Sequence, residues 1–181
     1  MKQALLVIDV QNEYFTGKLP VTYPKSSFFN ILKAVDAANT KQQDIVVIQH
    51  SAPQPNPQVF NKGSYEWNIH PAIVNRKHNF LVEKNLPGSF TNTELEVWLR
   101  DRGIDTVVIC GYMTQMCCDT TARQAFHLGF TVKFLSDATG TLSISNSAGA
   151  VTAEELHRAI LVTQEALFSE VIATEEWIST L

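Results

Sequence analysis

The stretch DTVVICGYMTQMCC, residues 105–118, indicates the fold class. Its first half is an apolar, β-branched run, which is typical of a strand buried on both faces of a parallel sheet. Gly111 ends this run, and Thr114 is then a suitable N-cap for a helix with Cys117 in its first turn. A strand followed at once by a helix is the repeating unit of an α/β fold. The sequence therefore predicts a thiol at the carboxyl end of a buried strand.

Two interpretations of Cys117 follow from this segment alone. Active sites of open α/β sheets lie at the carboxyl ends of strands. A helix N-terminus also offers unpaired N–H groups and a positive dipole, which lower a thiol pKa from about 8.5 to between about 3.5 and 7.5. This pattern favours a thiolate nucleophile. The alternative is a small buried apolar side chain, which is the commoner role of a free cysteine.

The rest of the chain repeats the alternation of strand and helix. Thr91 with Glu94, and Thr152 with Glu155, are capping-box patterns that predict helix starts. We expect strands over residues 4–10, 44–50, 80–84, 107–109, 130–136 and 170–173, with helices over 27–41, 92–102, 115–128 and 152–167 and a helical turn from Thr174. This order predicts one domain over residues 1–181. Its fold class is α/β, a three-layer α-β-α sandwich around a central, mostly parallel sheet of about six strands.

Composition restricts the classes of partner. Hydrophobic residues make up 45% of the chain, charged residues 18%, and the formal net charge is −4, without a basic cluster. We therefore expect no nucleic acid and no membrane as partner. Three clustered cysteines, Cys110, Cys117 and Cys118, form a poor disulfide framework. A cytoplasmic protein with a small-molecule substrate is the expectation.

Asp9, Lys84 and Cys117 each follow a predicted strand. If these strands are neighbours, the three side chains converge in one crevice. The carboxylate can then accept the thiol proton, and the ammonium can stabilise both anions. Each residue also has an ordinary interpretation, because most lysines are solvated and a strand-end acid often only binds a loop. An unpaired acid among the apolar neighbours of Asp9 is nevertheless costly, which favours the site.

Three segments of the chain resemble the isochorismatase-like cysteine hydrolase superfamily, and the similarity extends over nearly the whole chain. The resemblance implies a catalytic triad with Asp9 as proton acceptor and donor, Lys84 as electrostatic partner and Cys117 as nucleophile. It also implies that Cys118 occupies a packing position. The matching segments are LLVIDVQNEYF (5–15), VEKNLPGSFTNTELEVWLRDRGIDTVVICGYMTQMCCDTTARQA (82–125) and FLSDATGT (134–141).

The same resemblance implies details around the thiol. A cis peptide bond is expected between Tyr112 and Met113, and the backbone N–H groups of Met113 and Cys117 are expected to hold the oxyanion. Well-organised donors of this kind contribute roughly 3–4 kcal/mol each. Relatives commonly form dimers or tetramers, so the resemblance implies a homodimer or homotetramer.

The long proline-rich segment 51–79 and the segment after Asp9 are expected to shape the substrate pocket. We predict Phe15, Trp67, Ile69 and Tyr112 as substrate-binding residues. Trp67 and Ile69 lie in SYEWNIHP, which resembles the pocket rim of the family. Aromatic side chains line many ligand pockets, although plain packing is their more frequent role. Without an arginine to clamp a carboxylate, the loop favours a neutral or cationic amide.

Metal binding is not expected. Nicotinamidases of the superfamily bind a metal through an Asp-x-His motif after the second strand, where this chain has Gln49-His50-Ser51, and the next histidine is His70. Two histidines without a nearby acid are weak evidence for a metal. We predict no metal and no cofactor, and we interpret His50 as a strand-end hydrogen-bonding residue.

Retention of Cys117 favours acyl chemistry on an amide or carbamoyl carbon through a thioester. Two alternatives stay open. One is vinyl ether hydrolysis of the isochorismatase type, for which relatives commonly lack the cysteine. The other is a non-catalytic α/β domain that binds a small ligand, although the turn DVQNEYFTG has only one glycine and disfavours a nucleotide. A redox role for Cys117 and Cys118 lacks the Cys-x-x-Cys spacing.

Overall fold

Six parallel strands form the central sheet of the computed structural model, which describes residues 2–181. Their order across the sheet is β3-β2-β1-β4-β5-β8. The strand order therefore reverses between β1 and β4, which is where open α/β sheets bind ligands. The strands are β1 (Gln3–Ile8), β2 (Asp44–His50), β3 (Phe80–Lys84), β4 (Thr106–Tyr112), β5 (Thr131–Gly140) and β8 (Glu170–Ile172).

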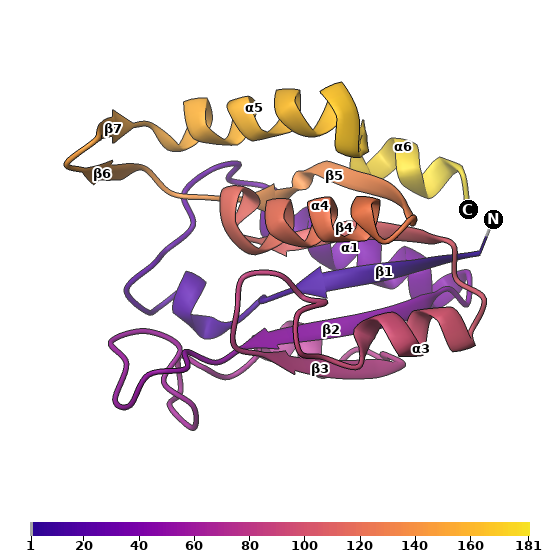
Figure 1. Cartoon of the computed structure of the whole chain (residues 1–181), viewed down its shortest axis with the longest axis horizontal. Coiled ribbons are helices and arrows are strands. Elements are labelled where there is room, and N and C mark those ends of the chain that lie inside the picture. Colours follow the sequence, from indigo (N-terminus) through magenta and orange to yellow (C-terminus); the bar gives the residue numbers. More distant parts are fainter. Residues whose placement is uncertain (1) are drawn as a thin grey trace.

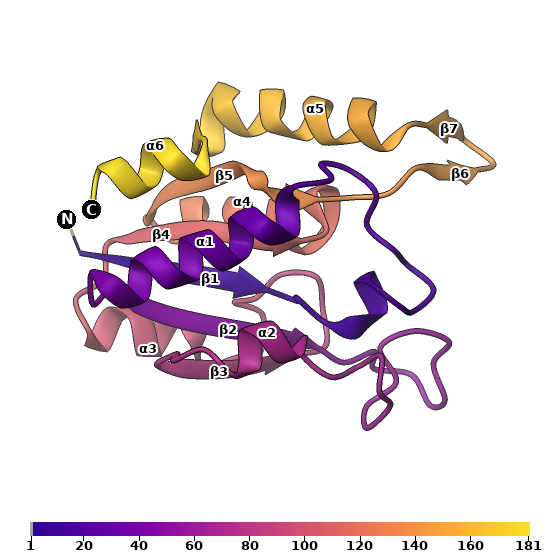
Figure 2. The ribbon, with the colours of Figure 1, turned by 180° about the vertical axis from the view of Figure 1, so that it is seen from behind.

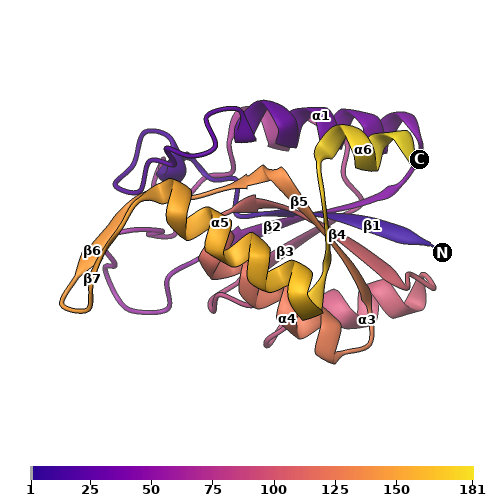
Figure 3. The ribbon, with the colours of Figure 1, turned by 90° about the horizontal axis from the view of Figure 1, so that it is seen from above.

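Helices cover both faces of the sheet, so the predicted three-layer sandwich is confirmed. Figure 3 shows α1 and α6 on one side of the strands and α3, α4 and α5 on the other. Figure 2 shows α2 beside α1 on the first side. The helices are α1 (Ser27–Thr40), α2 (Pro71–Val74), α3 (Leu95–Asp101), α4 (Asp119–His127), α5 (Ala153–Thr163) and α6 (Thr174–Ser179).

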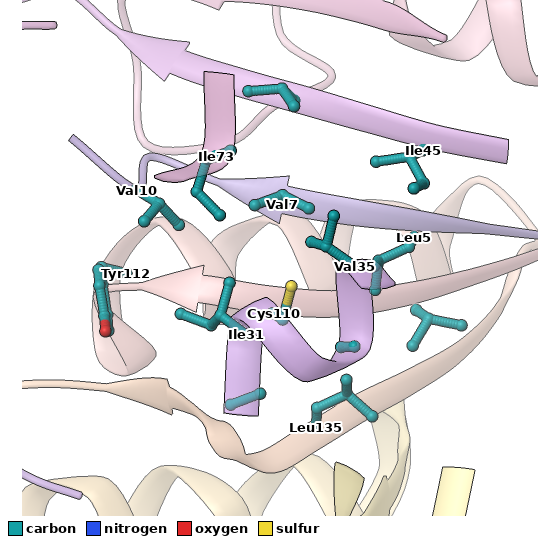
Figure 4. Close-up of a cluster of buried hydrophobic side chains, with 14 of the residues drawn as sticks. Leu5, Val7, Val10, Ile31, Val35, Ile45, Ile73, Cys110, Tyr112 and Leu135 are labelled. Carbon is teal, nitrogen blue, oxygen red and sulfur yellow. The ribbon is translucent and has the colours of Figure 1, made fainter. Parts of the chain in front are cut away.

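The alternation of side chains along β1 explains the two-sided core. Leu5 and Val7 belong to the apolar cluster on the α1 side, whereas Leu6 and Ile8 belong to the cluster on the other side, and all four are buried. Figure 4 shows the first cluster, where side chains of α1 such as Ile31 pack on the strands. Successive residues of a strand point to opposite faces, so a continuous apolar run is required.

Two of the predicted helix caps are wrong, and one is confirmed. Thr114 is the first residue of a π-helical turn, η2 (Thr114–Cys118), and its side chain does not cap this turn. Thr91 and Glu94 form no capping box, because α3 begins only at Leu95, and the Thr91 hydroxyl instead accepts a hydrogen bond from Gln124 Nε2 of α4. The box of Thr152 with Glu155 is present at the start of α5.

A short hairpin between β5 and α5 was not predicted. It consists of β6 (Ile144–Asn146) and β7 (Gly149–Val151), and Figure 1 shows it extending away from the sheet. Strands of three residues are too short for an alternating pattern to be recognised. Within residues 2–181, no helix combines the length and apolar character that crossing a bilayer requires.

Candidate functional site

Gly111 allows the ends of β1 and β4 to approach closely. It pairs with Ile8, and a Cβ atom at this position would lie 2.0 Å from the Ile8 carbonyl oxygen. Its φ of +117° is also a conformation that side-chain-bearing residues rarely adopt. Asp9 follows β1 with a φ of +51°, and its N–H donates to the Ile48 carbonyl oxygen of β2 at 2.9 Å. The acid and the turn after β4 are therefore held at one edge of the sheet.

Lys84 connects the predicted triad. It ends β3, two strands away from β1, and its side chain extends past the end of β2. Its Nζ lies 2.8 Å from Asp9 Oδ2 and 3.3 Å from Cys117 Sγ, and it donates to the Leu86 carbonyl oxygen at 3.1 Å. The side chains of Asp9 and Lys84 are both fully buried. The structure thus brings together the three side chains that the sequence places at strand ends.

The carboxylate of Asp9 retains unused acceptor capacity. Its contact with Lys84 is a short ion pair without the direction of a hydrogen bond, and among residues 2–181 neither carboxylate oxygen has a well-directed donor. A buried carboxylate with free lone pairs beside a thiol is suited to accept its proton.

The protonation of Cys117 differs from the sequence-based expectation. Burial raises the pKa of the Cys117 thiol, and the negative charge of Asp9 raises it further, while Lys84 opposes both effects. For Lys84, burial acts to lower the pKa, but the charges of Asp9 and Cys117 raise it above its ordinary value. The resting site therefore contains a thiol and an ammonium. The prediction of a lowered thiol pKa is wrong, because burial and the negative charge of Asp9 together outweigh the opposing effect of Lys84.

The turn that carries Cys117 has the predicted cis peptide bond between Tyr112 and Met113. The carbonyl oxygen of Met113 accepts hydrogen bonds from the N–H groups of Met116 at 3.1 Å and Cys118 at 3.2 Å. The turn is therefore closed by the Met113 carbonyl group. The assignment of the Met113 and Cys117 N–H groups as oxyanion donors stays a prediction.

His50 joins the cluster, although it was not predicted as a site residue. It ends β2 directly beside Lys84 of β3, and its Nδ1 lies 3.4 Å from Lys84 Nζ. Because an ammonium only donates, Nδ1 is the acceptor and Nε2 carries the proton. Burial and the charge of Lys84 lower the pKa of His50, so the ring is neutral at pH 7. His50 also lies at the carboxyl end of a predicted strand, so the argument that selected Asp9, Lys84 and Cys117 from the sequence could have selected it as well.

The four predicted substrate-binding residues have well-defined neighbours. Phe15 is partly buried and lies 4.6 Å, between ring centroids, from His70, while Trp67 donates from Nε1 to Ser51 Oγ at 2.7 Å. Ile69 and Tyr112 are buried in the core cluster on the α1 side. Phe15 and Trp67 are therefore more accessible to a substrate than the buried Ile69 and Tyr112. For all four residues, substrate binding stays a prediction.

A cavity of about 420 Å³ lies between the segment after β1 and the loop after β2. Glu13, Lys18, Asn61 and Glu66 are among its lining residues, whereas the triad is not. Phe60 connects the two places, since its N–H donates to Glu13 Oε2 at 3.3 Å and its ring lies 5.0 Å from that of His50. The cluster of Cys117, Lys84 and Asp9, and not the size of this cavity, is the reason for choosing the candidate site.

The two histidines considered for metal binding have different partners. His50 contacts Lys84, whereas His70 Nδ1 accepts the Ala72 N–H at the start of α2. Residues 2–181 contain no group of three or more histidine, cysteine, aspartate or glutamate side chains arranged to hold a metal ion.

Comparison with known proteins shows the family of the chain. The family model described as "Isochorismatase domain" matches residues 3–176. The chain belongs to the isochorismatase family. Members of this family are hydrolases, and this protein is accordingly a hydrolase. The superfamily resemblance that we drew from the sequence is confirmed.

Individual relatives cover most of the chain. The uncharacterised isochorismatase family protein YddQ of Bacillus subtilis is 30% identical over 98% of this chain and 99% of its own. Nicotinamidase 3 of Arabidopsis thaliana is 32% identical over 88% of this chain and 78% of its own. A crystal structure of a candidate isochorismatase from Burkholderia xenovorans LB400 has a TM-score of 0.95 and 45% identity, covering 98% of this chain and 86% of that one.

Proposed function

We propose that this isochorismatase-family hydrolase cleaves a C–N bond of a small-molecule amide or carbamoyl compound, with Cys117 as nucleophile. One observation carries the proposal: Lys84 Nζ contacts both Asp9 Oδ2 at 2.8 Å and Cys117 Sγ at 3.3 Å within a buried cluster. An acid, a cation and a thiol in contact form a nucleophilic site in which the base is already present.

The first half-reaction forms a thioester. Asp9 accepts the thiol proton as Cys117 Sγ attacks the carbonyl carbon, and the N–H groups of Met113 and Cys117 hold the oxyanion. Asp9 then donates this proton to the leaving nitrogen, the C–N bond breaks, and ammonia or an amine departs. Lys84 keeps its proton throughout, because its raised pKa favours the ammonium, and it stabilises the thiolate and the carboxylate in turn.

The second half-reaction restores the thiol. Asp9 accepts a proton from water, whose oxygen attacks the thioester carbon. The C–S bond breaks, and Asp9 returns the proton to Cys117 Sγ. The product is a carboxylic or a carbamic acid, and the site regains the protonated thiol that burial favours.

The substrate class follows from charge and from the relatives. We assign Phe15, Trp67, Ile69 and Tyr112 to the pocket wall and favour a neutral or cationic amide. Nicotinamidase 3 is named for an amide substrate, which supports C–N cleavage. This chain lacks the Asp-x-His motif at Gln49-His50-Ser51, so we place its activity in metal-independent amide hydrolysis.

A panel of primary amides and carbamoyl compounds tests the proposal by release of ammonia or amine. We expect Cys117→Ala and Asp9→Asn to reduce the rate to background, since each removes a group that exchanges the proton. The matched control is Cys118→Ala, which removes the neighbouring thiol from the same turn and should retain activity. Trapping of an acyl adduct on Cys117, mapped by peptide mass, identifies the intermediate.

Two results would contradict this function. Cleavage of isochorismate that is unimpaired in Cys117→Ala would identify a vinyl ether hydrolase. Tight binding of a small molecule without turnover across the panel would identify a binding domain.

We further propose a cytoplasmic homodimer or homotetramer in which residues 1–181 form one domain. Light scattering coupled to gel filtration gives the oligomer number, and a single cooperative unfolding transition is the result expected of one domain.

A further inference from the structure

A buried histidine outside the triad is connected to the turn of the nucleophile. His157 belongs to α5 and is only 4% exposed. Its Nδ1 lies 2.9 Å from Thr114 Oγ1, and its Nε2 lies 2.9 Å from the carbonyl oxygen of Ser136 in β5. A carbonyl oxygen only accepts, so Nε2 carries the proton and Nδ1 accepts from the Thr114 hydroxyl. Both ring nitrogens are therefore used.

Thr114 is the first residue of the turn η2, directly after Met113 and three residues before Cys117, and it is fully buried. The turn has no side-chain cap of its own. The hydroxyl of Thr114 consequently fastens the start of η2 to a helix that lies 43 positions further along the chain. Burial lowers the pKa of His157, which keeps the ring in the neutral form that this bond requires.

We propose that His157 is a positioning residue of the hydrolase, which through Thr114 fixes the orientation of the turn that presents the Met113 and Cys117 N–H groups and the thiol. This inference rests on the proposed function. Oxyanion donors act within a narrow range of distances. A misplacement of about 1 Å can reduce the rate by about 10²-fold, so a single buried bond at the start of this turn has a large effect on turnover.

Two conservative variants separate the two nitrogens of His157. Asparagine places an amide oxygen near the position of Nδ1, so His157→Asn keeps an acceptor for Thr114. Glutamine places an amide N–H near the position of Nε2, so His157→Gln keeps the bond to Ser136. We expect kcat to fall by about 10- to 100-fold in His157→Gln with an unchanged KM, and to stay within about threefold of the parent in His157→Asn. The two variants should have similar Tm values.

Thr114 provides the reciprocal test. Thr114→Val removes the hydroxyl at nearly constant volume and should lower kcat as much as His157→Gln does, whereas Thr114→Ser should retain activity. Both changes break the same hydrogen bond between Thr114 and His157. The double variant Thr114→Val with His157→Gln should therefore have a kcat no lower than that of either single variant. Additive losses, or losses of kcat that follow Tm, overturn the inference.

Backbone hydrogen exchange keeps the test independent of the substrate. We expect the amides of residues 113–118 to exchange faster in His157→Gln and Thr114→Val, and at the parental rate in His157→Asn and Thr114→Ser. Unchanged exchange in His157→Gln contradicts the inference even if the parent hydrolyses no amide. Persistent activity of Cys117→Ala, by contrast, contradicts the proposed function alone.

Discussion

Adjacent residues of β3 form two ion pairs that differ in almost every respect. Glu83 binds Lys62 Nζ through both carboxylate oxygens, at 2.6 and 2.7 Å, and also accepts from Ser51 Oγ at 2.8 Å. The Lys62 and Glu83 side chains are 63% and 37% exposed, whereas those of Lys84 and Asp9 are fully buried. Successive residues of a strand point to opposite faces of the sheet, so the neighbours Glu83 and Lys84 lie in different environments.

The comparison shows how the same pair of functional groups serves two purposes. The exposed pair is fully hydrogen-bonded and holds the loop after β2, whose Trp67 also binds Ser51. The buried pair lacks well-directed donors to Asp9 and lies against a thiol. Exposed pairs contribute about 0–1 kcal/mol, while buried pairs carry a desolvation cost that stability alone does not justify. The buried pair is thus where a functional explanation is needed.

The largest expected difference is in stability when each lysine is replaced. Lys84→Met leaves the Asp9 carboxylate buried without its counter-ion, so we expect the free energy of unfolding to fall by about 3–5 kcal/mol. Urea unfolding at pH 7 measures this change. Lys62→Met is the matched control on the neighbouring pair. Equal losses in both variants would show that burial does not distinguish the pairs.

Neutralising the buried pair sharpens the same comparison. We expect Asp9→Asn combined with Lys84→Met to regain most of the stability lost in Lys84→Met, since no unpaired charge stays buried. Asparagine also tolerates the positive φ of this position. The double variant should still be inactive, because both the base and the cation are absent. Recovery of activity together with stability would argue against a catalytic role for the pair.

The protonated thiol predicts a pH dependence of stability. Burial raises the folded-state pKa of Cys117 above its ordinary value, so at alkaline pH the folded state keeps a proton that the unfolded state loses. The stabilisation is fully present below about pH 9 and is lost as the pH rises further, by up to about 1.4 kcal/mol per pH unit. Chemical unfolding between pH 8 and 10.5 should show a shallower decline in Cys117→Ala. An identical decline in both proteins would indicate an ordinary thiol pKa.

The smallest effect is expected at the exposed pair itself. Lys62→Met should lower the free energy of unfolding by no more than about 1 kcal/mol, and the difference should shrink at high salt, which screens exposed charges. Urea unfolding in 0.05 M and 1 M salt measures both quantities. A larger loss in the free energy of unfolding that does not change with salt would show that the Lys62–Glu83 pair contributes more to stability than an exposed ion pair normally does.

Strand ends were the most predictable part of this molecule. The apolar runs before Asp9, Lys84 and the turn of Cys117 predicted that all three groups lie at strand ends, and they meet at one edge because parallel strands align their carboxyl ends. The glycine expected to end the third run, Gly111, instead lies within β4. Local sequence patterns were less informative about the hydrogen-bond partners of individual side chains. Thr114 has the typical features of an N-cap, yet its hydroxyl binds His157, a contact between distant parts of the chain that no local pattern encodes.

The protonation of the thiol was also beyond the sequence. The sequence predicts a low thiol pKa from the helix that follows, whereas burial and the charge of Asp9 raise the pKa of Cys117 by more than Lys84 lowers it. The degree of burial depends on packing between segments that are distant along the chain. The position of the Cys117 thiol beyond a strand end was thus predictable from the chain, but its protonation depends on the tertiary structure.

The contact between Gly111 and Ile8 has a practical consequence for engineering. The spacing between the base and the thiol depends on a missing side chain, since even a methyl group at position 111 would meet the Ile8 carbonyl oxygen at 2.0 Å. If the loop after β2 forms the pocket wall, as we propose, its exposed side chains are the positions at which to vary the substrate range. Position 111 must stay glycine, because any side chain there would push apart the backbones of β1 and β4, on which the positions of Asp9 and Cys117 depend.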